Sequence, residues 1–208
     1  MIIAGSRDEG GSARFPRWWA DAVTLARVAL MPVFLLAAKW TNAAVAAGLP
    51  SGGRRVTVLT LLLVIGASDK LDGWVARRSG QPPTRRGAIM DAGSDRLVQW
   101  AGVWFFTLRA SPAFTPLPLW LAGVLVARDA LLLAIWLRHR RAEPVSFEHE
   151  IHGKAATVAV FLALFAATAS ARADIAAAAA VLAGAAIAYS TIRYATRTWV
   201  RPAATASG

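Results

Sequence analysis

Cysteine is absent from this chain of 208 residues, and acidic residues are scarce. Without a thiol, a disulfide framework and any thiol chemistry are excluded. Only 12 Asp and Glu oppose 23 Lys and Arg, so the formal net charge is +11. An excess of this size often indicates nucleic-acid binding, but here the basic residues stand between apolar runs rather than along one face. The pattern instead favours a membrane protein held by anionic lipid headgroups, with no nucleic-acid partner.

Hydrophobic residues make up 56% of the chain, and the mean hydropathy of +0.46 is high for a protein with so many cations. The length suggests a single domain. The N-terminus, MIIAGSRDEGGSAR, lacks the apolar core of a signal peptide and combines Gly, Ser and mixed charge. We therefore expect a disordered tail over residues 1–14, one membrane domain over 15–200 and a C-terminal tail over 201–208.

Long apolar runs separated by turn residues predict an all-α fold, an integral membrane bundle of six transmembrane helices. The predicted spans are residues 22–38, 56–77, 87–108, 119–137, 154–171 and 174–194. Residues 40–55, which include Pro50, Gly52 and Gly53, are predicted to form a loop. The aromatic and basic residues at 15–19 suit a short helix at the membrane interface.

Lys and Arg gather on one side of this predicted bundle. That side receives both termini, the loop after the second span and the loop after the fourth. Because positively charged loops stay in the cytoplasm, both termini and the end of the second span are predicted to be cytoplasmic. We expect a multi-pass protein of the cell membrane.

Four aspartates lie where the second span ends and the third begins: Asp69, Asp72, Asp91 and Asp95. Acidic groups beside apolar runs are costly unless they pair or bind something. Spacings of three and four residues place each pair on one helical face, and two facing helices would bring the four carboxylates to one point. Since four anions repel one another, this arrangement calls for cations, most simply a divalent metal.

The residues around the aspartates indicate what such a metal would serve. Gly73 removes a side chain beside Asp72, so that a ligand can approach the backbone closely. Arg77 offers a planar fork of donors suited to a phosphate. Together these features predict phosphoryl chemistry on a metal-bound diphosphate.

In these residues the chain resembles the CDP-alcohol phosphatidyltransferase family, in particular its phosphatidylglycerophosphate synthase-like and cardiolipin synthase-like members. All eight fixed residues of the family motif are present, as Asp69-x-x-Asp72-Gly73-x-x-Ala76-Arg77 and then Gly87-x-x-x-Asp91-x-x-x-Asp95. The gap between the halves holds nine residues where eight is common, and its Pro-containing loop can absorb one more. The first predicted span is also similar, with Thr24, Arg27 and Pro32 at matching places. Ala20 and Asp21 stand where the family often has Pro-Asn.

The resemblance implies an enzyme that transfers a phosphatidyl group from CDP-diacylglycerol to an acceptor alcohol and releases CMP. It implies that Asp69, Asp72 and Asp91 bind Mg²⁺ or Mn²⁺, and that Asp95 shares the metal site and serves as the base. The residues implied to bind the CDP-lipid are Asp69, Gly73, Ala76, Arg77 and Gly87. The family also implies a homodimer.

The acceptor alcohol is less closely defined by these residues. Gly153-Lys154-x-x-Thr157 resembles a segment of phosphatidylglycerophosphate synthase-like members, which favours glycerol 3-phosphate as the acceptor in phospholipid biosynthesis, with Arg128 and Lys154 binding its phosphate. The alternatives are a cardiolipin synthase that uses phosphatidylglycerol, and a phosphatidylinositol phosphate synthase. A membrane transporter is the alternative outside the enzymes, although aspartates at span ends beside Gly and Arg fit nucleotide chemistry better; a scaffold would leave the carboxylates unexplained.

Two arginines in predicted spans admit two interpretations each. Arg27 either snorkels to the interface or binds a phosphate or carboxylate within the site. Arg128 either forms an ion pair with Asp129 or another helix, or binds the acceptor with Asp129 orienting it. The three histidines fall in the segment 138–154 and lack the helical spacing of a zinc motif, so this segment is predicted to be a solvated loop.

Overall fold

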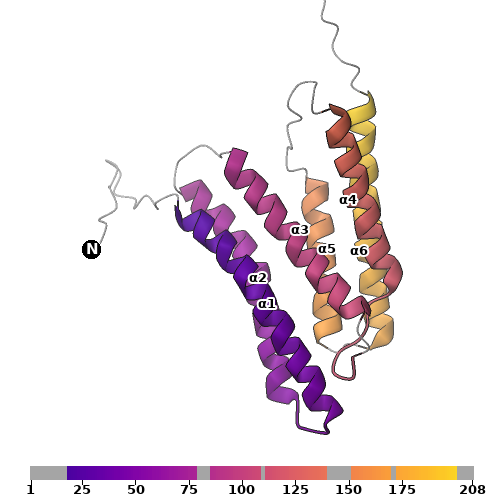
Figure 1. The fold of residues 1–208 in the computed structure, drawn as a ribbon. Helices are drawn as coiled ribbons and strands as arrows, with labels where there is room; N and C mark the ends of the chain where they lie inside the picture. Colours follow the sequence, from indigo (N-terminus) through magenta and orange to yellow (C-terminus); the bar gives the residue numbers. More distant parts are fainter. Residues whose placement is uncertain (1–17, 79–84, 109–110, 140–150, 170–171, 201–208) are drawn as a thin grey trace, which may run out of the picture. The chain divides into compact units, whose positions relative to one another are not determined.

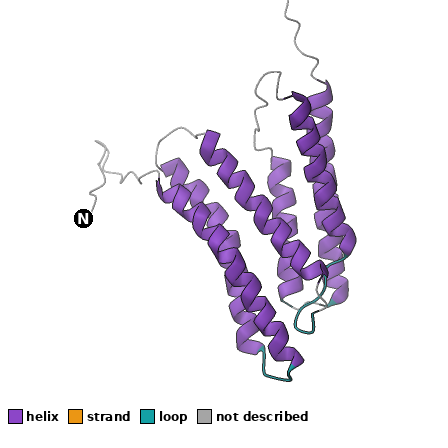
Figure 2. Ribbon diagram, viewed as in Figure 1, coloured by secondary structure: helices purple, strands orange, loops and turns teal. Residues whose placement is uncertain are grey.

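The computed structural model describes residues 18–78, 85–108, 111–139, 151–169 and 172–200, which form six α-helices and no strand (Figures 1 and 2). In chain order the helices are α1 Trp18–Ala46, α2 Gly52–Arg78, α3 Arg85–Leu108, α4 Leu119–His139, α5 Ile151–Thr168 and α6 Ala173–Val200. At 18–21, 69–78, 85–89, 91–92, 136, 139, 151–152 and 197–200 the description covers the helix backbone but not the side chains. The predicted tails 1–14 and 201–208 lie outside the described residues. The all-α prediction is confirmed.

The chain divides into two compact units, residues 1–101 and 102–208, which are treated separately below. In the first unit α1 and α2 pack against each other as a helical hairpin (Figure 1). Their shared core is apolar and fully buried, with Met31 and Phe34 from α1 and Val58, Leu62 and Ile65 from α2. These positions recur at helical spacing on each helix, which is why one face of each is buried.

The turn between α1 and α2 is much shorter than the predicted loop at 40–55, so that prediction was wrong. Helix α1 runs on to Ala46, where Gly48 adopts a φ of 71°. The N–H of Gly48 donates to the Val45 carbonyl at 3.0 Å and the N–H of Leu49 to the Ala44 carbonyl at 2.9 Å. This pair of bonds closes a helix C-terminus around a left-handed glycine, so the stop signal lies at 48 rather than at 40.

No separate surface helix precedes α1 within the described residues, because Trp18 and Trp19 are the first residues of α1 itself. The rest of the predicted interfacial segment, residues 15–17, lies outside the described residues.

In the second unit α6 packs against both α5 and α4. Its buried face is a stripe of small side chains at helical spacing, with Ala176, Ala180 and Ala183 followed by Ile187. Small residues let helix backbones approach closely. The alanine-rich run is thus a packing surface, as the sequence predicted.

The Pro-containing segment at 111–118 is tied to two helix ends of this unit. The N–H of Leu117 donates to the Phe106 carbonyl and the N–H of Thr115 to the Ala167 carbonyl, both at 3.1 Å. The ring of Phe114 meets that of Phe106 edge to face at 5.7 Å between centroids. Carbonyls that a helix C-terminus leaves without helical partners are satisfied in this way.

Two helices of the described chain are long and apolar enough to cross a membrane, over Ala22–Ala46 in α1 and Ala173–Thr196 in α6. A shorter apolar stretch covers Gly153–Thr168 in α5. This is a statement about length and composition alone, and it does not establish the predicted six-span bundle.

The close contact of α4 with α6 can be tested at Gly184. A Cβ there would lie 2.6 Å from Cζ3 of Trp120, whereas a Cβ at Gly123 in α4 would meet nothing within 4 Å. We expect Gly184→Val to lower stability by about 1–3 kcal/mol, because overpacking forces neighbouring groups apart. Gly123→Val is the matched control and should leave the thermal unfolding temperature in detergent nearly unchanged. Trp120→Ala should relieve most of the Gly184→Val effect, and independent effects of the two changes would contradict the predicted contact.

Candidate active site

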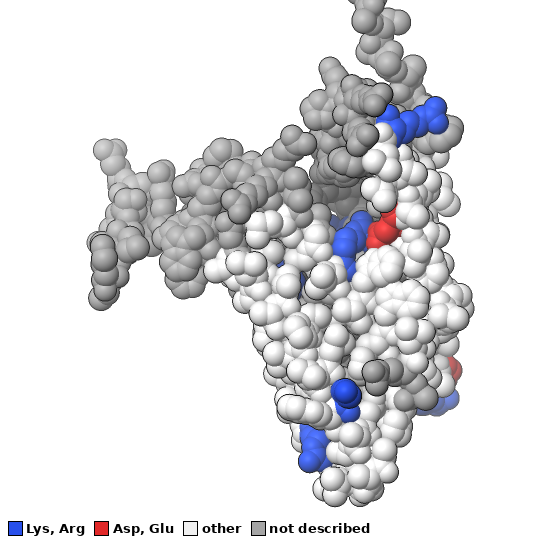
Figure 3. Space-filling model, in the orientation of Figure 1, with Lys and Arg blue, Asp and Glu red and all other residues white. Residues whose placement is uncertain are grey.

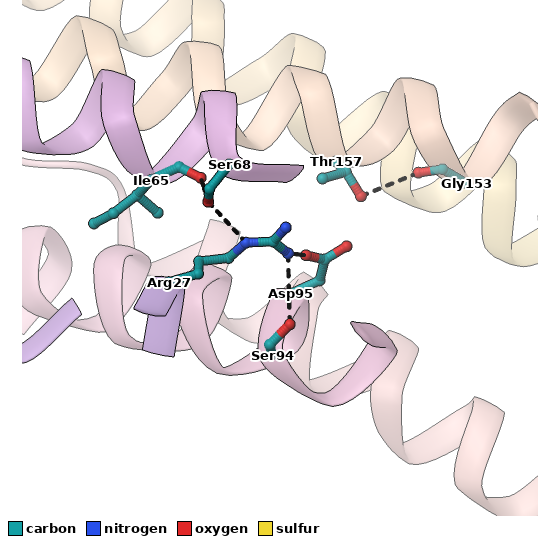
Figure 4. A network of polar contacts seen from close by, with 7 residues as sticks. All are labelled: Arg27, Ile65, Ser68, Ser94, Asp95, Gly153 and Thr157. Atoms are coloured by element: carbon teal, nitrogen blue, oxygen red, sulfur yellow. Dashed lines mark hydrogen bonds and ion pairs between the residues drawn. The ribbon is translucent and has the colours of Figure 1, made fainter. Parts of the chain in front are cut away.

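A buried arginine stands at the centre of the polar contacts in the first unit. Arg27 of α1 is 1% exposed. Its Nε donates to Ser68 Oγ of α2 at 3.1 Å, and its Nη1 donates to Ser94 Oγ of α3 at 3.5 Å. The same Nη1 forms an ion pair with Asp95 Oδ1 (Figure 4). One guanidinium therefore joins α1, α2 and α3.

The sequence of α1 explains why this arginine is buried. Arg27 lies three residues after Thr24 and four and seven residues before Met31 and Phe34, and all four side chains are buried. They share one helical face, the face that packs against α2. A guanidinium on this buried face needs a counter-charge and hydrogen-bond acceptors. The carboxylate partner is thereby confirmed for Arg27, and snorkelling to the interface is wrong.

Sequence reasoning missed the two serines that bind this arginine. Ser68 directly precedes Asp69, and Ser94 directly precedes Asp95, so a Ser-Asp step occurs once in each half of the motif. Both serines are buried, and Ser68 Oγ also donates to the Ile65 carbonyl at 2.7 Å. The repeated Ser-Asp step was the signal available in the sequence.

These contacts bring the two halves of the aspartate motif together. Ser68 belongs to the α2 half, while Ser94 and Asp95 belong to the α3 half, and all three bind one guanidinium (Figure 4). The backbone places the other motif residues in α2 and α3, but their side chains are not described: Asp69, Asp72, Gly73, Ala76, Arg77, Gly87 and Asp91. Convergence of the four carboxylates therefore stays a prediction.

The donor set suits a hard divalent cation. Carboxylate oxygens are the ligands that Mg²⁺ and Mn²⁺ prefer. Asp95 is 26% exposed although its partner Arg27 is sealed, so this carboxylate lies at an accessible surface. The single positive charge of Arg27 can offset only one of the four carboxylate charges. If the other three converge beside Asp95, further positive charge is required, and a metal ion fits that requirement.

The predicted acceptor residues lie in the second unit. Arg128 of α4 is 7% exposed, and its Nε donates to Asp129 Oδ1 at 3.1 Å. The expected ion pair with the neighbouring residue is present, which is compatible with either interpretation of Arg128. Lys154 is exposed in the first turn of α5, where Thr157 Oγ donates to the Gly153 carbonyl at 3.3 Å. Nothing in these contacts tests acceptor binding.

The histidine-containing segment is only partly described. His139 ends α4 and His152 lies in the first turn of α5, so the predicted loop is shorter than 138–154. Its middle, residues 140–150 with His149, lies outside the described residues.

The meeting of the two motif halves can be tested in solution, since the chain contains no cysteine. A Ser68→Cys/Ser94→Cys double variant should be bridged by a bis-maleimide with a short spacer, because the two hydroxyls bind the same guanidinium from opposite sides (Figure 4). Mass spectrometry of the digested protein would identify the bridged peptide. The control pair Ser51→Cys/Ser94→Cys has its first thiol at the turn end of α2 and should not be bridged. Equal yields from both pairs would contradict the arrangement.

Comparison with known proteins agrees with the motif. The family model described as CDP-alcohol phosphatidyltransferase matches residues 17–192. The chain is 37% identical over 141 residues to a cardiolipin synthase (CMP-forming) of Streptomyces coelicolor, across 66% of this chain and 58% of that protein. It is 36% identical over 76 residues to a probable cardiolipin synthase (CMP-forming) of Drosophila melanogaster, across 36% of this chain and 22% of that protein.

The matched parts thus span little more than half of the first relative and about a fifth of the second. No solved structure matches the chain with significant similarity. The family match nevertheless covers most of the chain and includes both halves of the aspartate motif together with Arg27. On this evidence the chain belongs to the CDP-alcohol phosphatidyltransferases, an enzyme family.

Proposed function

We propose that the protein transfers a phosphatidyl group from CDP-diacylglycerol to an acceptor alcohol and releases CMP. The observation that carries this proposal is the junction at Arg27, where Ser68, Ser94 and Asp95 from the two motif halves bind one guanidinium.

In the proposed reaction the acceptor hydroxyl attacks the phosphorus that carries the diacylglycerol. The new bond joins this phosphorus to the acceptor oxygen, while the bond to the CMP oxygen breaks. The hydroxyl proton passes to the Asp95 carboxylate, which is accessible enough for this role at 26% exposure. CMP leaves with the electron pair of the broken bond.

The remaining motif residues supply the binding site in this proposal. Asp69, Asp72, Asp91 and Asp95 would hold Mg²⁺ or Mn²⁺, which when bound neutralises diphosphate charge and polarises phosphoryl oxygens. Arg77 would bind a phosphate of the CDP-lipid with its planar fork. Small residues would leave room for the nucleotide, namely Gly73, Ala76 and Gly87.

The relatives favour phosphatidylglycerol as the acceptor. Both curated relatives described above are cardiolipin synthases by name. We therefore place cardiolipin formation first, ahead of the glycerol 3-phosphate favoured by Gly153-Lys154-x-x-Thr157. Glycerol 3-phosphate remains the second candidate, supported by the buried Arg128 and the exposed Lys154, two cations suited to a phosphate. No described contact favours inositol phosphate.

We further propose that all six helices lie in the cell membrane, as a multi-pass bundle with the motif and both termini on the cytoplasmic side. Large apolar side chains are exposed on several helices, among them Leu63 of α2, Leu133 of α4 and Leu182 of α6. On the face of the molecule drawn in Figure 3, charged groups are sparse among the described residues. Lipid tails would cover such a surface. The cytoplasmic supply of cytidine nucleotides supports the orientation, and the homodimer rests on the family alone.

The function is tested by incubating the purified protein with CDP-diacylglycerol, Mg²⁺ and one acceptor at a time. We expect CMP release with phosphatidylglycerol and a product with the mass of cardiolipin. Chelation of the metal should abolish release, and Asp72→Asn should lower it by at least ~10²-fold, as expected when a metal or its ligand is lost. A product formed only with glycerol 3-phosphate would select the second candidate. If no acceptor leads to release of CMP, the proposed function is overturned.

Acceptor binding by Arg128 and Lys154 is tested by replacing each with Gln. A hydrogen bond to a charged group contributes ~1.5–3 kcal/mol, so, if glycerol 3-phosphate is the acceptor, each variant should raise the KM for it by roughly 10- to 100-fold. The affinity for CDP-lipid should stay nearly unchanged. Arg172→Gln is the control, because Arg172 also pairs with a nearby aspartate, Asp174, but is 81% exposed. An acceptor KM at the wild-type level in both variants would remove these residues from the acceptor site.

A further inference from the structure

We infer that Arg27 is a positioning residue for phosphatidyl transfer: it holds the Asp95 carboxylate in one orientation and does not itself touch the substrate. The inference rests on the proposed function and deepens it. It also replaces the alternative in which Arg27 binds a substrate phosphate directly.

The contrast in burial separates the two roles. Arg27 is 1% exposed, while Asp95 is 26% exposed. A substrate can therefore reach the carboxylate, whereas the guanidinium is closed off behind it. An effect of Arg27 on the reaction is therefore expected to act through the accessible carboxylate that it binds.

The chemistry of arginine suits this role. The terminal torsion of an aspartate is broad, so the orientation of its carboxylate is set by the donors around it. Nη1 of Arg27 binds Asp95 Oδ1, while Nε is held by Ser68. A planar guanidinium bound at two nitrogens has its orientation fixed, whereas a lysine ammonium carries all its donors on one nitrogen at the end of a flexible stem.

Ser68 extends this support into α2. Its hydroxyl donates to the Ile65 carbonyl at 2.7 Å and accepts from Arg27 Nε at 3.1 Å. Ser68, in the α2 half of the motif, therefore orients the guanidinium, and the guanidinium in turn orients Asp95 in the α3 half. Ser94, next to Asp95 in the chain, binds the same Nη1 and closes the arrangement.

A misplaced base lowers kcat more than it lowers substrate affinity, because proton transfer depends on a short, aligned contact between the base and the hydroxyl. Arg27→Lys keeps the charge and loses the Nε donor. We expect it to lower kcat by at least ~10-fold, part of the ~10²–10⁴-fold that a positioned base supplies. The Kd for CDP-diacylglycerol and the acceptor KM should change little. Arg54→Lys, an exposed arginine that donates to the Pro50 carbonyl, is the matched control and should keep the wild-type kcat.

The decisive measurement is a double-mutant cycle with Asp95→Asn. If Arg27 acts through Asp95, Arg27→Lys should lower kcat in the wild-type background and cause no further loss beside Asp95→Asn. If Arg27 had a purely structural role, its substitution would lower the fraction of folded protein in both backgrounds. The kcat is therefore calculated per mole of folded protein, and the folded fraction is measured by thermal unfolding. Equal losses of kcat in the two backgrounds would overturn the inference, as would a rise in KM or Kd with kcat unchanged.

Two further readouts keep the test decisive. Ser68→Ala keeps both members of the ion pair and removes the acceptor at Nε together with the hydrogen bond to the Ile65 carbonyl, so it should lower kcat less than Arg27→Lys does. Wild-type kcat in Ser68→Ala would overturn the support from α2, even where Arg27→Lys fails to fold. If the wild-type protein releases no CMP, the proposed function fails. The unfolding temperatures of Arg27→Lys, Asp95→Asn and the double variant then test the ion pair itself. If the two substitutions lower the unfolding temperature additively, the Arg27–Asp95 contact is overturned as well.

Discussion

The burial of one guanidinium is the constraint on which the first unit depends. Arg27 is 1% exposed on the buried face of α1, where an unpaired charge would be very costly. Breaking a buried ion pair by removing one partner costs about 3–5 kcal/mol, a large share of the stability of a domain. The partners come from α2 and α3, so the packing of three helices and the placement of Asp95 satisfy the same requirement.

The second unit is held together by different means. There the helices pack through small residues, with the alanine stripe of α6 and Gly184 against Trp120, and the segment at 111–118 ties helix ends through backbone hydrogen bonds. Such contacts fix distances between helices. Asp95, the base in the proposed mechanism, lies in the first unit, where the apolar core of α1 and α2 is joined by the ion pair of Asp95 with Arg27.

The sequence predicted the helices well and the contacts between them poorly. Six apolar runs gave six helices, since composition and periodicity are local properties. The error at 40–55 arose from reading Gly52 and Gly53 as loop residues, although they begin α2. The family resemblance implied a role as base for Asp95, but its contact with Arg27 joins residues 68 positions apart. Such a pairing depends on how helices pack, and the residues alone left two interpretations of Arg27 open.

The acceptor was hard to predict for a related reason. Under the proposed mechanism the events at phosphorus are the same for every acceptor alcohol, so the motif and Arg27 serve glycerol 3-phosphate and phosphatidylglycerol alike. All eight motif residues and Arg27 belong to residues 1–101, whereas Arg128 and Lys154 belong to residues 102–208. If Arg128 and Lys154 bind the acceptor as proposed, transfer chemistry and acceptor choice are carried by different parts of the chain. A family motif in the first unit would then identify the reaction without identifying the acceptor.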